Sequence, residues 1–584
     1  MFSKGACGVR GPASGIPPLF LSPYQFYFPT FGHTVVMKNH IKGDVGYMMN
    51  EFMGDSVGRA TVQVPILDKV LTAEVAGDYS LPDYQPEIKR LLRITTNVLP
   101  PNRFAGSSGT ELGGTLDYYV LYMGHDGGVY CAPLSAEYRM EAEPDAEERS
   151  AASTAGEPMV CLCDTVAEPP VGRVTAPRRL NIRCKIKSHV KLYGECPPVD
   201  DGGDEDTVEK LMGKAEVARL YWGLGELLPL QDGLILSPSE GERRVVCAEG
   251  QVMMTEITPA QGLVNCRGEV TVKLTLCPAE SDSLTADGLS ERVTPPLTVM
   301  QRKIPFSQAI ELEGVTPACM ATACGHCTDI AVLLEEGHVH VDLGVITEVR
   351  AQKNEVVTYA KDLYSTRRSD ACRYATYPTE SAVRAFNGNF TLSDSAELTE
   401  VGIEPTARVA DVTAVAVPEA LTADVAKGRC VLTGTCRCHL LLLRDGEYSM
   451  AEMELPFRYE FDDPALLKLD AEVVERNFDG EVTVINCRAR MDGERVGVDA
   501  ELAVSLRTHA PAPLTVLTEA GFGDEITRRR GEYVICFPAP TDTVWSVAKR
   551  YHAPMAALTA ANNLPGGVDA DDAASLEGVG YLIV

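Results

Sequence analysis

Apolar and polar residues alternate along most of the chain between residues 60 and 510, in short pieces separated by Gly, Pro and Asp. Successive side chains of a β-strand point to opposite faces, so this period of two predicts half-buried strands joined by turns. The chain is therefore expected to be mainly β structure.

Part of this alternation repeats at long range. Three segments each carry a Gly followed by a strand-like run of alternating apolar positions, and they span 113–130, 267–280 and 433–449. The first and third continue into Asp-Gly, a favoured hairpin connection. Further along, 301–314 and 452–463 each contain Pro-Phe, which suits an edge strand or a bulge, whereas the corresponding stretch of the first copy lacks it. The pattern predicts three related units of unequal length.

The pattern changes after residue 530. Residues 540–565 show helical spacing between the strand-like segments 532–537 and 580–584, which predicts a small α+β module of strand, helix, helix and strand. We expect Asp542 to cap the first helix and Pro554 to stand where the second begins. The positions expected to face inward are Val544, Val547, Ala548, Tyr551, Met555, Leu558 and Ala561.

Polar residues mark the ends of these two helices. Lys549 and Arg550 end the first helix, where positive charge suits the helix dipole. Asn562 and Asn563 are expected to close the second helix.

Length and composition limit the possible classes of protein. A chain of 584 residues, 45% hydrophobic and 23% charged, is expected to form several soluble globular domains. The net charge of −29, from 53 Lys and Arg against 82 Asp and Glu, argues against nucleic acid as a partner. No apolar run is long enough to insert into a membrane.

The first 55 residues differ from the rest. Prolines interrupt the apolar stretch 15–32, and no small-residue cleavage pattern follows, so we do not expect a signal peptide. Met48, Met49 and Met53 lie just before the first orderly sequence. Residues 1–55 are therefore expected to be a disordered leader or to precede the true start, which N-terminal sequencing of the native protein would test.

The chain has 18 cysteines, which suggests a reducing compartment with most thiols buried as small hydrophobes. Cys319, Cys324 and Cys327, with histidines nearby, are candidate zinc ligands. The alternative is a Cys-rich strand and turn, and it is favoured because only one C-x2-C pair has finger-like spacing. Two further pairs are separated by two positions, which places each pair on one strand face in the core: Cys161 with Cys163, and Cys436 with Cys438.

Catalytic motifs are not found in the sequence. There is no G-x-S-x-G, H-E-x-x-H, phosphate-binding loop or dinucleotide fingerprint. His439 alternates with its strand and is interpreted as a surface or satisfied core residue. We expect no enzyme activity, no cofactor and no metal.

Several motifs resemble a known family. Residues 76–94, with the run from Leu81 to Ile88, resemble the opening motif of the SPOCS domain, named for spore coat proteins and SipL, and segments 178–195, 304–315 and 361–370 are similar to its later signatures. The resemblance covers about 60–510. It implies a non-enzymatic, SipL-like morphogenetic protein of endospore-forming clostridial bacteria, with three sandwich-like SPOCS units at 56–172, 173–350 and 351–515.

The segment 530–584 resembles a LysM module. LysM modules commonly bind peptidoglycan and other N-acetylglucosamine polymers through the loops before the first helix and after the second. On this chain the corresponding residues are Thr541, Asp542, Thr543, Val544, Asn562, Asn563, Leu564 and Pro565. Thr541 replaces the usual Gly, which removes an easy positive-φ position and close backbone approach. The second loop is also longer and acidic.

The resemblance also implies a protein partner. In SipL-like proteins the terminal LysM module contacts the ATPase that forms the basal layer of the coat. The preferred hypothesis is a coat scaffold in the mother-cell cytoplasm, at the forespore surface, that docks on this ATPase and on other coat proteins. The second hypothesis is a cell-wall protein that binds peptidoglycan. Trp545 is either a packing residue or an interface anchor, and Lys549 and Arg550 are expected on the same docking face.

Overall fold

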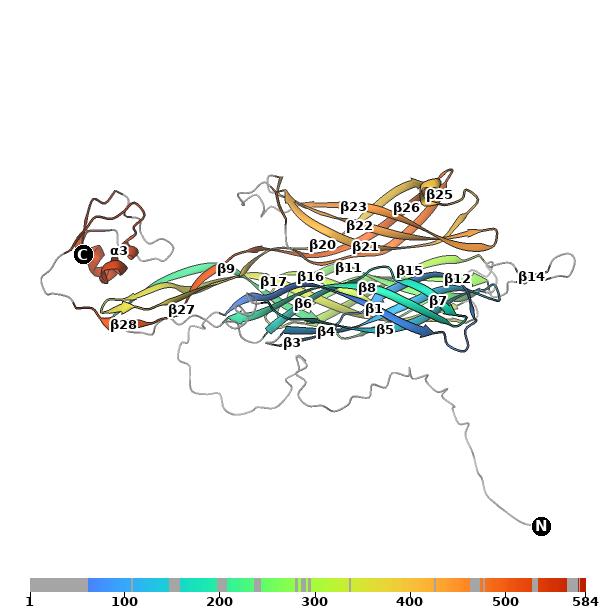
Figure 1. Ribbon diagram of the computed structural model, residues 1–584, viewed down its shortest axis with the longest axis horizontal. Coiled ribbons are helices and arrows are strands. Elements are labelled where there is room, and N and C mark those ends of the chain that lie inside the picture. Colours follow the sequence, from blue (N-terminus) through green and yellow to red (C-terminus); the bar gives the residue numbers. More distant parts are fainter. Residues whose placement is uncertain are drawn as a thin grey trace, which may run out of the picture. The chain divides into compact units, whose positions relative to one another are not determined.

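The computed structural model describes residues 61–106, 109–145, 158–196, 207–235, 243–278, 282–284, 290–292, 296–335, 338–424, 427–462, 473–475, 478–527, 534–564, 576 and 578–584. Antiparallel strands dominate these residues, which confirms the prediction of mainly β structure (Figure 1). They all fall within the compact unit Asp55–Val584. The expected leader, 1–55, lies outside the described residues.

Six strands recur in the same order three times. In each set the first, fifth and sixth strands form one antiparallel sheet with the sixth in the middle, and the second, third and fourth form another with the third in the middle. The first set is β1 (Val62–Ser80), β2 (Ile88–Val98), β4 (Gly109–Gly124), β5 (Val129–Ala142), β6 (Pro158–Ala167) and β8 (Arg179–Cys196). The second is β9 (Val208–Leu224), β11 (Arg243–Ala260), β12 (Leu263–Pro278), β15 (Thr298–Glu311), β16 (Met320–Glu335) and β17 (His338–Ser365). The third is β20 (Glu380–Glu397), β21 (Arg408–Asp424), β22 (Arg429–Arg444), β23 (Glu447–Asp462), β25 (Phe478–Asp492) and β26 (Arg495–Pro511).

Each pair of sheets encloses apolar side chains between its layers, and we call the three pairs the first, second and third sandwich. The third sandwich shows why: Val412, Leu440 and Leu455 from one sheet share a buried cluster with Val498 and Leu502 from the other. Alternation supplies these residues, because every second side chain of a strand points into the same layer.

Shorter elements extend these sheets or connect them. Four strands add to sheet edges: β3 (Asn102–Gly106) on β4, β7 (Val171–Ala176) on β8, β10 (Leu228–Ile235) on β17 and β24 (Val473–Glu475) on β21. Three two-stranded pairs stand apart: β13 (Asp282–Leu284) with β14 (Ser290–Arg292), β18 (Arg368–Asp370) with β28 (Phe522–Glu525), and β19 (Arg373–Tyr377) with β27 (Leu514–Glu519). A short helix, α2 (Leu398–Val401), follows β20.

Sheet pairing divides the chain at different points from those expected. Cys196 ends β8, which pairs with β1 and β6, so the first sandwich runs past the expected boundary at residue 172. Ser365 ends β17, which pairs with β9 and β16 beyond the expected boundary at 350. The last strand of each set pairs with strands of its own set. The boundary between the first and second sandwiches therefore falls after Cys196, and the boundary between the second and third falls after Ser365. The assignment of these sets to SPOCS units stays a prediction.

In each sandwich, one sheet has a glycine in its middle strand, β4, β12 or β22, that lies opposite an aromatic residue on the neighbouring edge strand. The pairs are Gly114 with Tyr138, Gly268 with Phe306, and Gly434 with Phe457. A Cβ atom at these glycines would lie 2.3, 2.7 and 2.5 Å from the facing ring, so the ring occupies the space that a side chain would need. This shared feature explains the Gly of the sequence repeat, and it shows that Tyr138 takes the place of the missing Pro-Phe aromatic.

The turns and edges follow the expected chemistry. Asp445 and Gly446 join β22 to β23 with φ values of 48° and 77°, the left-handed pair that a type I′ hairpin requires. Pro305 and Pro456 lie in β15 and β23, each of which is an edge strand of its sheet. An edge strand tolerates proline because one side of it needs no N–H donor, and both predictions are confirmed.

Buried charged groups join the sandwiches. Glu348 of β17 accepts hydrogen bonds from Arg103 of β3 at 2.5 Å and from Arg350 at 2.8 Å. Arg350 in turn pairs with Asp164 of β6 at 2.6 Å, and that carboxylate accepts the backbone N–H of Gly480 in β25. Strands of all three sandwiches therefore meet at one buried network.

A second polar network connects β8 to the third sandwich. Lys191 lies 3.1 Å from the imidazole of His509, which lies 3.1 Å from Glu380. Tyr193 donates its hydroxyl to Glu380 at 2.9 Å, and Arg507 donates to the same hydroxyl. Because a buried charge without a partner is costly, such networks favour one fixed arrangement of the sandwiches.

Within the part of the chain that the structure describes, no helix has the length and apolar character needed to cross a membrane.

Candidate functional site

The last described segment forms a small module, which we call the C-terminal module (534–564, 576 and 578–584). It contains β29 (Ile535–Cys536), α3 (Val544–Tyr551), α4 (Met555–Ala561) and β30 (Leu582–Ile583), and β29 pairs with β30. The order of strand, helix, helix and strand is the expected one. Val547, Ala548 and Leu558 are fully or almost fully buried between these elements, whereas Ala561 is exposed and the expectation that it faces inward is wrong.

The loop before α3 holds the first group of expected binding residues. Thr541 is exposed, and Thr543 is the N-cap, accepting the backbone N–H of Ser546 at 3.1 Å. The prediction that Asp542 caps the helix is wrong. Asp542 lies one residue before the cap, and it instead accepts the backbone N–H of Ala539 and pairs with Arg550 at 2.6 Å.

The loop after α4 holds the second group. Asn562 donates to the backbone of Leu558 and both donates to and accepts from the backbone of Ile583, so its amide ties α4 to β30. Asn563 is exposed with a φ of 51°, and Leu564 is half-buried. Asn562 and Asn563 close the helix as expected. Pro565 and the acidic residues after it lie outside the described residues.

Trp545 and Lys549 contact the end of β17. The Trp545 indole N–H donates to Asp362 at 2.8 Å, and the side chain is only 5% exposed. Lys549 pairs with the same carboxylate at 2.5 Å. Burial would raise the pKa of Asp362, but hydrogen bonds from Lys549, Tyr374 and Trp545 hold it below its ordinary value. Trp545 is therefore a packing residue in this structure, and its partner, Asp362, lies far away in the sequence.

Two other residues of the second sandwich complete this contact, and sequence analysis did not identify them. Tyr364 is fully buried, donates its hydroxyl to the carbonyl of Ala553 at 2.7 Å and packs edge-on against the Trp545 ring. Glu209 of β9 accepts the backbone N–H of Met555 at 3.1 Å, which supplies the helix cap that Pro554 has no side chain to provide. Tyr364 lies in the segment 361–370, which the sequence marked only as a family signature.

The C-terminal module also carries apolar residues that are exposed. Five large hydrophobic residues of β29, β30 and their neighbours keep between 38% and 75% of their surface exposed, and we call them the apolar face: Val534, Ile535, Phe537, Tyr581 and Ile583. Ile535 and Ile583 are direct cross-strand partners, while Cys536 and Leu582 point inward and are buried. Exposed large apolar residues gathered on one small element are a recognised feature of interaction surfaces.

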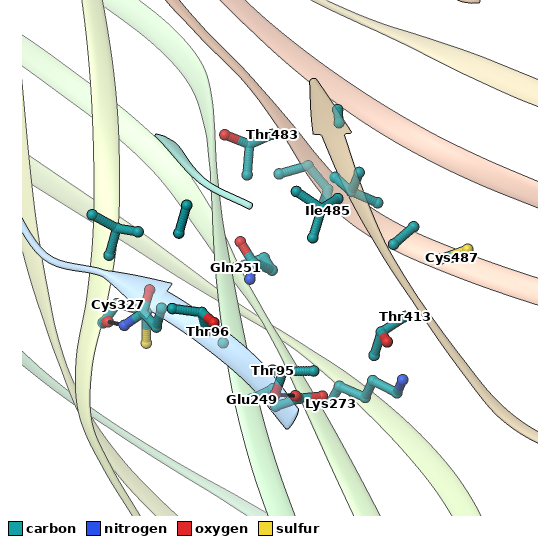
Figure 2. Close-up of a pocket in the computed structure, with 18 of the residues that line it drawn as sticks. Thr95, Thr96, Glu249, Gln251, Lys273, Cys327, Thr413, Thr483, Ile485 and Cys487 are labelled. Atoms are coloured by element: carbon teal, nitrogen blue, oxygen red, sulfur yellow. Dashed lines mark hydrogen bonds between the residues drawn. The ribbon is translucent and has the colours of Figure 1, made fainter. Parts of the chain in front are cut away.

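A cavity of about 250 Å³ lies where strands of the three sandwiches meet. Its walls come from β2 and β6, from β11, β12, β15 and β16, and from β21, β22 and β25. Figure 2 shows Thr95, Glu249 and Lys273 together at one side of the cavity, with Thr483 and Ile485 at another.

Glu249 and Lys273 of the cavity wall belong to a buried ion network that continues behind it to Arg93 and Asp411. Asp411 of β21 pairs with Arg93 of β2 at 2.7 Å and with Lys273 of β12 at 2.5 Å, and Glu249 of β11 lies 3.7 Å from Arg93. Burial would raise the pKa of Asp411, but the charges of Arg93 and Lys273 hold it below its ordinary value. The network joins β2 of the first sandwich, β11 and β12 of the second and β21 of the third.

Other polar atoms of the cavity wall have no hydrogen-bond partner among the described residues. These atoms include Oγ1 of Thr271 and Nε2 of His439, and both are buried. Burial also lowers the pKa of His439, which keeps its ring neutral near pH 7. Nδ1 of His439 lies 3.5 Å from Glu452 and the side chain is 22% exposed, so only Nε2 departs from the expected surface or satisfied position. Unpaired polar groups beside charged ones suit the cavity to small polar molecules rather than to purely apolar ones.

The expected positions of the cysteines are confirmed for both two-apart pairs, because Cys161, Cys163, Cys436 and Cys438 are all buried. Cys324 and Cys327 lie in β16, and Cys319 lies just before it. Among the described residues, no group of three or more His, Cys, Asp or Glu side chains is placed to hold a metal ion.

Comparison of the sequence with protein-family models and with curated proteins, and of the structure with solved structures, finds no match.

Proposed function

We propose that this chain is a non-enzymatic scaffold of endospore coat assembly, whose C-terminal module docks on the ATPase of the coat basal layer. Support for the coat assignment comes from the motifs that resemble SPOCS and LysM sequences. Its setting would be the mother-cell cytoplasm at the forespore surface.

The observation that carries the docking proposal is the apolar face. Phe537 and Tyr581 are 75% and 59% exposed on a module that contacts β17 through other residues, Trp545 and Lys549. Aromatic side chains of this kind are frequent anchors of protein interfaces. Trp545 and Lys549 belong to the internal contact with Asp362, so changes at these two residues would disturb the chain itself.

Three buried networks support a scaffold role. They fix the sandwiches to one another through Glu348, Asp411 and Glu380, and the internal contact at Tyr364 fixes the C-terminal module to the second sandwich. A protein that holds several components in a set geometry benefits from such rigid joints, because flexible joints would add an entropy cost to each assembly step.

The test is a two-component binding assay between the full chain and the purified coat ATPase. Phe537→Ser with Tyr581→Ser should weaken binding about 1,000-fold, since two interface anchors at about 2 kcal/mol each contribute about 4 kcal/mol. The matched control is Val171→Ser, because Val171 of β7 is 71% exposed on the first sandwich. Equal affinity of the double variant and the control variant would refute docking through the apolar face.

Peptidoglycan binding is the second candidate, favoured by the exposure of Thr541 and Asn563 on the two loops that LysM modules commonly use. Pelleting of the full chain with insoluble peptidoglycan, lost on Thr541→Lys with Asn563→Lys, would support it. Retention on peptidoglycan without binding to the ATPase would replace the scaffold proposal.

A further inference from the structure

Two thiols from different sandwiches face each other at close range. The Sγ atoms of Cys131 in β5 and Cys247 in β11 are 3.1 Å apart, and 116 residues separate them in the sequence. A disulfide bond is about 2.05 Å long, so a movement of about 1 Å would bring the two sulfurs to bonding distance. Both cysteines are free thiols in this structure.

Neighbouring contacts hold the two strand segments in this register. Arg244, three residues before Cys247, donates to the carbonyl of Val129, two residues before Cys131, at 2.7 Å. Its guanidinium also lies 4.6 Å from the centre of the Tyr130 ring. On the other side, Gln85 donates to the carbonyl of Cys131 at 3.2 Å. The closeness of the thiols therefore does not rest on one flexible side chain.

The surroundings of this pair also connect the sandwiches. Cys131 packs against a buried apolar cluster to which the three sandwiches contribute Leu121, Val246 and Leu441, together with Cys277 of β12. Of the facing pair, Cys131 is partly exposed and Cys247 is 5% exposed. Cys131 is therefore the more exposed residue of the pair, and we expect a soluble oxidant to react with it first.

We infer that Cys131 and Cys247 are a modification site at which a low-molecular-weight disulfide, such as glutathione disulfide, introduces a covalent cross-link between the first and second sandwiches.

The chemistry proceeds in two exchange steps. The Cys131 thiolate attacks one sulfur of glutathione disulfide, which forms a mixed disulfide and releases one glutathione thiolate. Cys247, after losing its proton to solvent, attacks the Cys131 sulfur and expels the second glutathione. The two protein thiols are oxidised to one disulfide, and one glutathione disulfide is reduced to two glutathione molecules.

The environment also sets the speed of the second step. The hydrogen bond with Cys131, together with burial, raises the pKa of Cys247 well above its ordinary value. Because the thiolate is the nucleophile, closure should be slow near pH 7 and faster as the pH rises. The cross-link is accordingly a response to sustained oxidation.

The experiment uses the full chain, fully reduced and then incubated with glutathione disulfide at pH 8. Remaining thiols are alkylated, and the protein is digested with trypsin without reduction. We expect a linked pair of peptides, 104–139 carrying Cys131 and 245–267 carrying Cys247. Because the second peptide also contains Cys266, fragment ions must place the link at Cys247.

Variants separate this site from its neighbours. Cys131→Ser and Cys247→Ser should each abolish the linked pair, whereas Cys277→Ser, a change at a buried thiol of the same cluster, should retain it. The oxidised wild-type protein should also unfold at a higher temperature than the reduced protein, since the link closes a long loop.

Three results would overturn the inference, and the first two need only the wild-type protein. One is recovery of both cysteines as alkylated or glutathione-bound after prolonged oxidation. Another is a link that joins two chains, seen as a dimer on a non-reducing gel. The third is a linked pair that persists unchanged in Cys247→Ser, which would place the link at Cys266.

Discussion

Replacement of Glu348 by Gln should destabilise the protein more than any surface charge change on the same strand. Glu348 is 5% exposed and sits between Arg103 and Arg350. The Gln side chain has nearly the same shape but carries no charge, so Arg103 loses its main counter-charge and Arg350 keeps only Asp164, in a buried setting. Removal of one partner from a buried ion network is strongly destabilising.

The size of the effect can be worked out from the pKa. Burial would raise the pKa of Glu348, but the charges of Arg103 and Arg350 and their hydrogen bonds lower it from 4.5 to about 2. A difference of about 2.5 units between folded and unfolded states corresponds to about 3 kcal/mol of stability at neutral pH. We therefore expect Glu348→Gln to lower the free energy of unfolding by about 3 kcal/mol at pH 7.

The same pKa fixes the direction of the pH dependence. Because the folded-state pKa is lowered, the stabilisation is complete above about pH 4.5 and is lost as the pH falls towards 2. Protonated Glu348 is as neutral as Gln. The difference between wild type and Glu348→Gln should therefore be constant from pH 6 to 8 and should shrink below pH 4.5.

The assay is denaturant unfolding, with hydrogen exchange of the β17 backbone to localise the change. The matched control is Glu355→Gln on the same strand, where the carboxylate pairs with Lys353 and is 33% exposed. We expect the control to cost less than about 1 kcal/mol. A cost for Glu348→Gln no larger than that of the control, or a difference that persists unchanged at pH 2.5, would refute the reasoning.

Three further predictions concern the glycine–aromatic pairs, the C-terminal module and the ion network of the cavity. Gly434→Ala should lower the free energy of unfolding, measured by thermal unfolding, by about 1–3 kcal/mol, because its Cβ would lie 2.5 Å from both a ring carbon and a backbone oxygen. The control is Gly497→Ala, where the nearest neighbouring atom is 3.7 Å away, and it should lower the free energy of unfolding by less or should raise it. Asp362→Asn should raise hydrogen exchange in α3 about tenfold or more while β22 stays protected, and equal protection of α3 in both proteins would contradict its role as the anchor of the module. Asp411→Asn should cost about 3–5 kcal/mol and broaden the thermal transition as the sandwiches lose their shared counter-charge, and an unchanged calorimetric transition would argue against this.

The sequence determined the strands, their turns and their edges. Alternation alone identifies the layers because a strand places every second side chain on one face. Asp445 and Gly446 specify a hairpin through their tolerance of positive φ, and Pro305 specifies an edge strand because it cannot donate a hydrogen bond. These signals are local, and the structure confirms each of them.

The sequence also indicated the elements of the C-terminal module but not the role of each polar residue. Asp542 and Thr543 are both good capping residues and are adjacent, so composition could not decide between them. In the structure the guanidinium of Arg550 pairs with Asp542, and Thr543 is the cap that accepts the N–H of Ser546.

Only the tertiary structure decided what the polar faces of the strands contact. In β12 the alternation assigns Thr271, Lys273 and Thr275 to the face away from the core of the sandwich, which a single sheet would expose to solvent. Thr271 and Thr275 are buried instead, and Lys273 pairs with Asp411 of the third sandwich. A period of two separates the two faces of a strand but carries no information about a neighbouring sandwich more than a hundred residues away. The cavity, the ion networks and the facing thiols all arise from such long-range contacts, and for that reason the sequence alone did not reveal them.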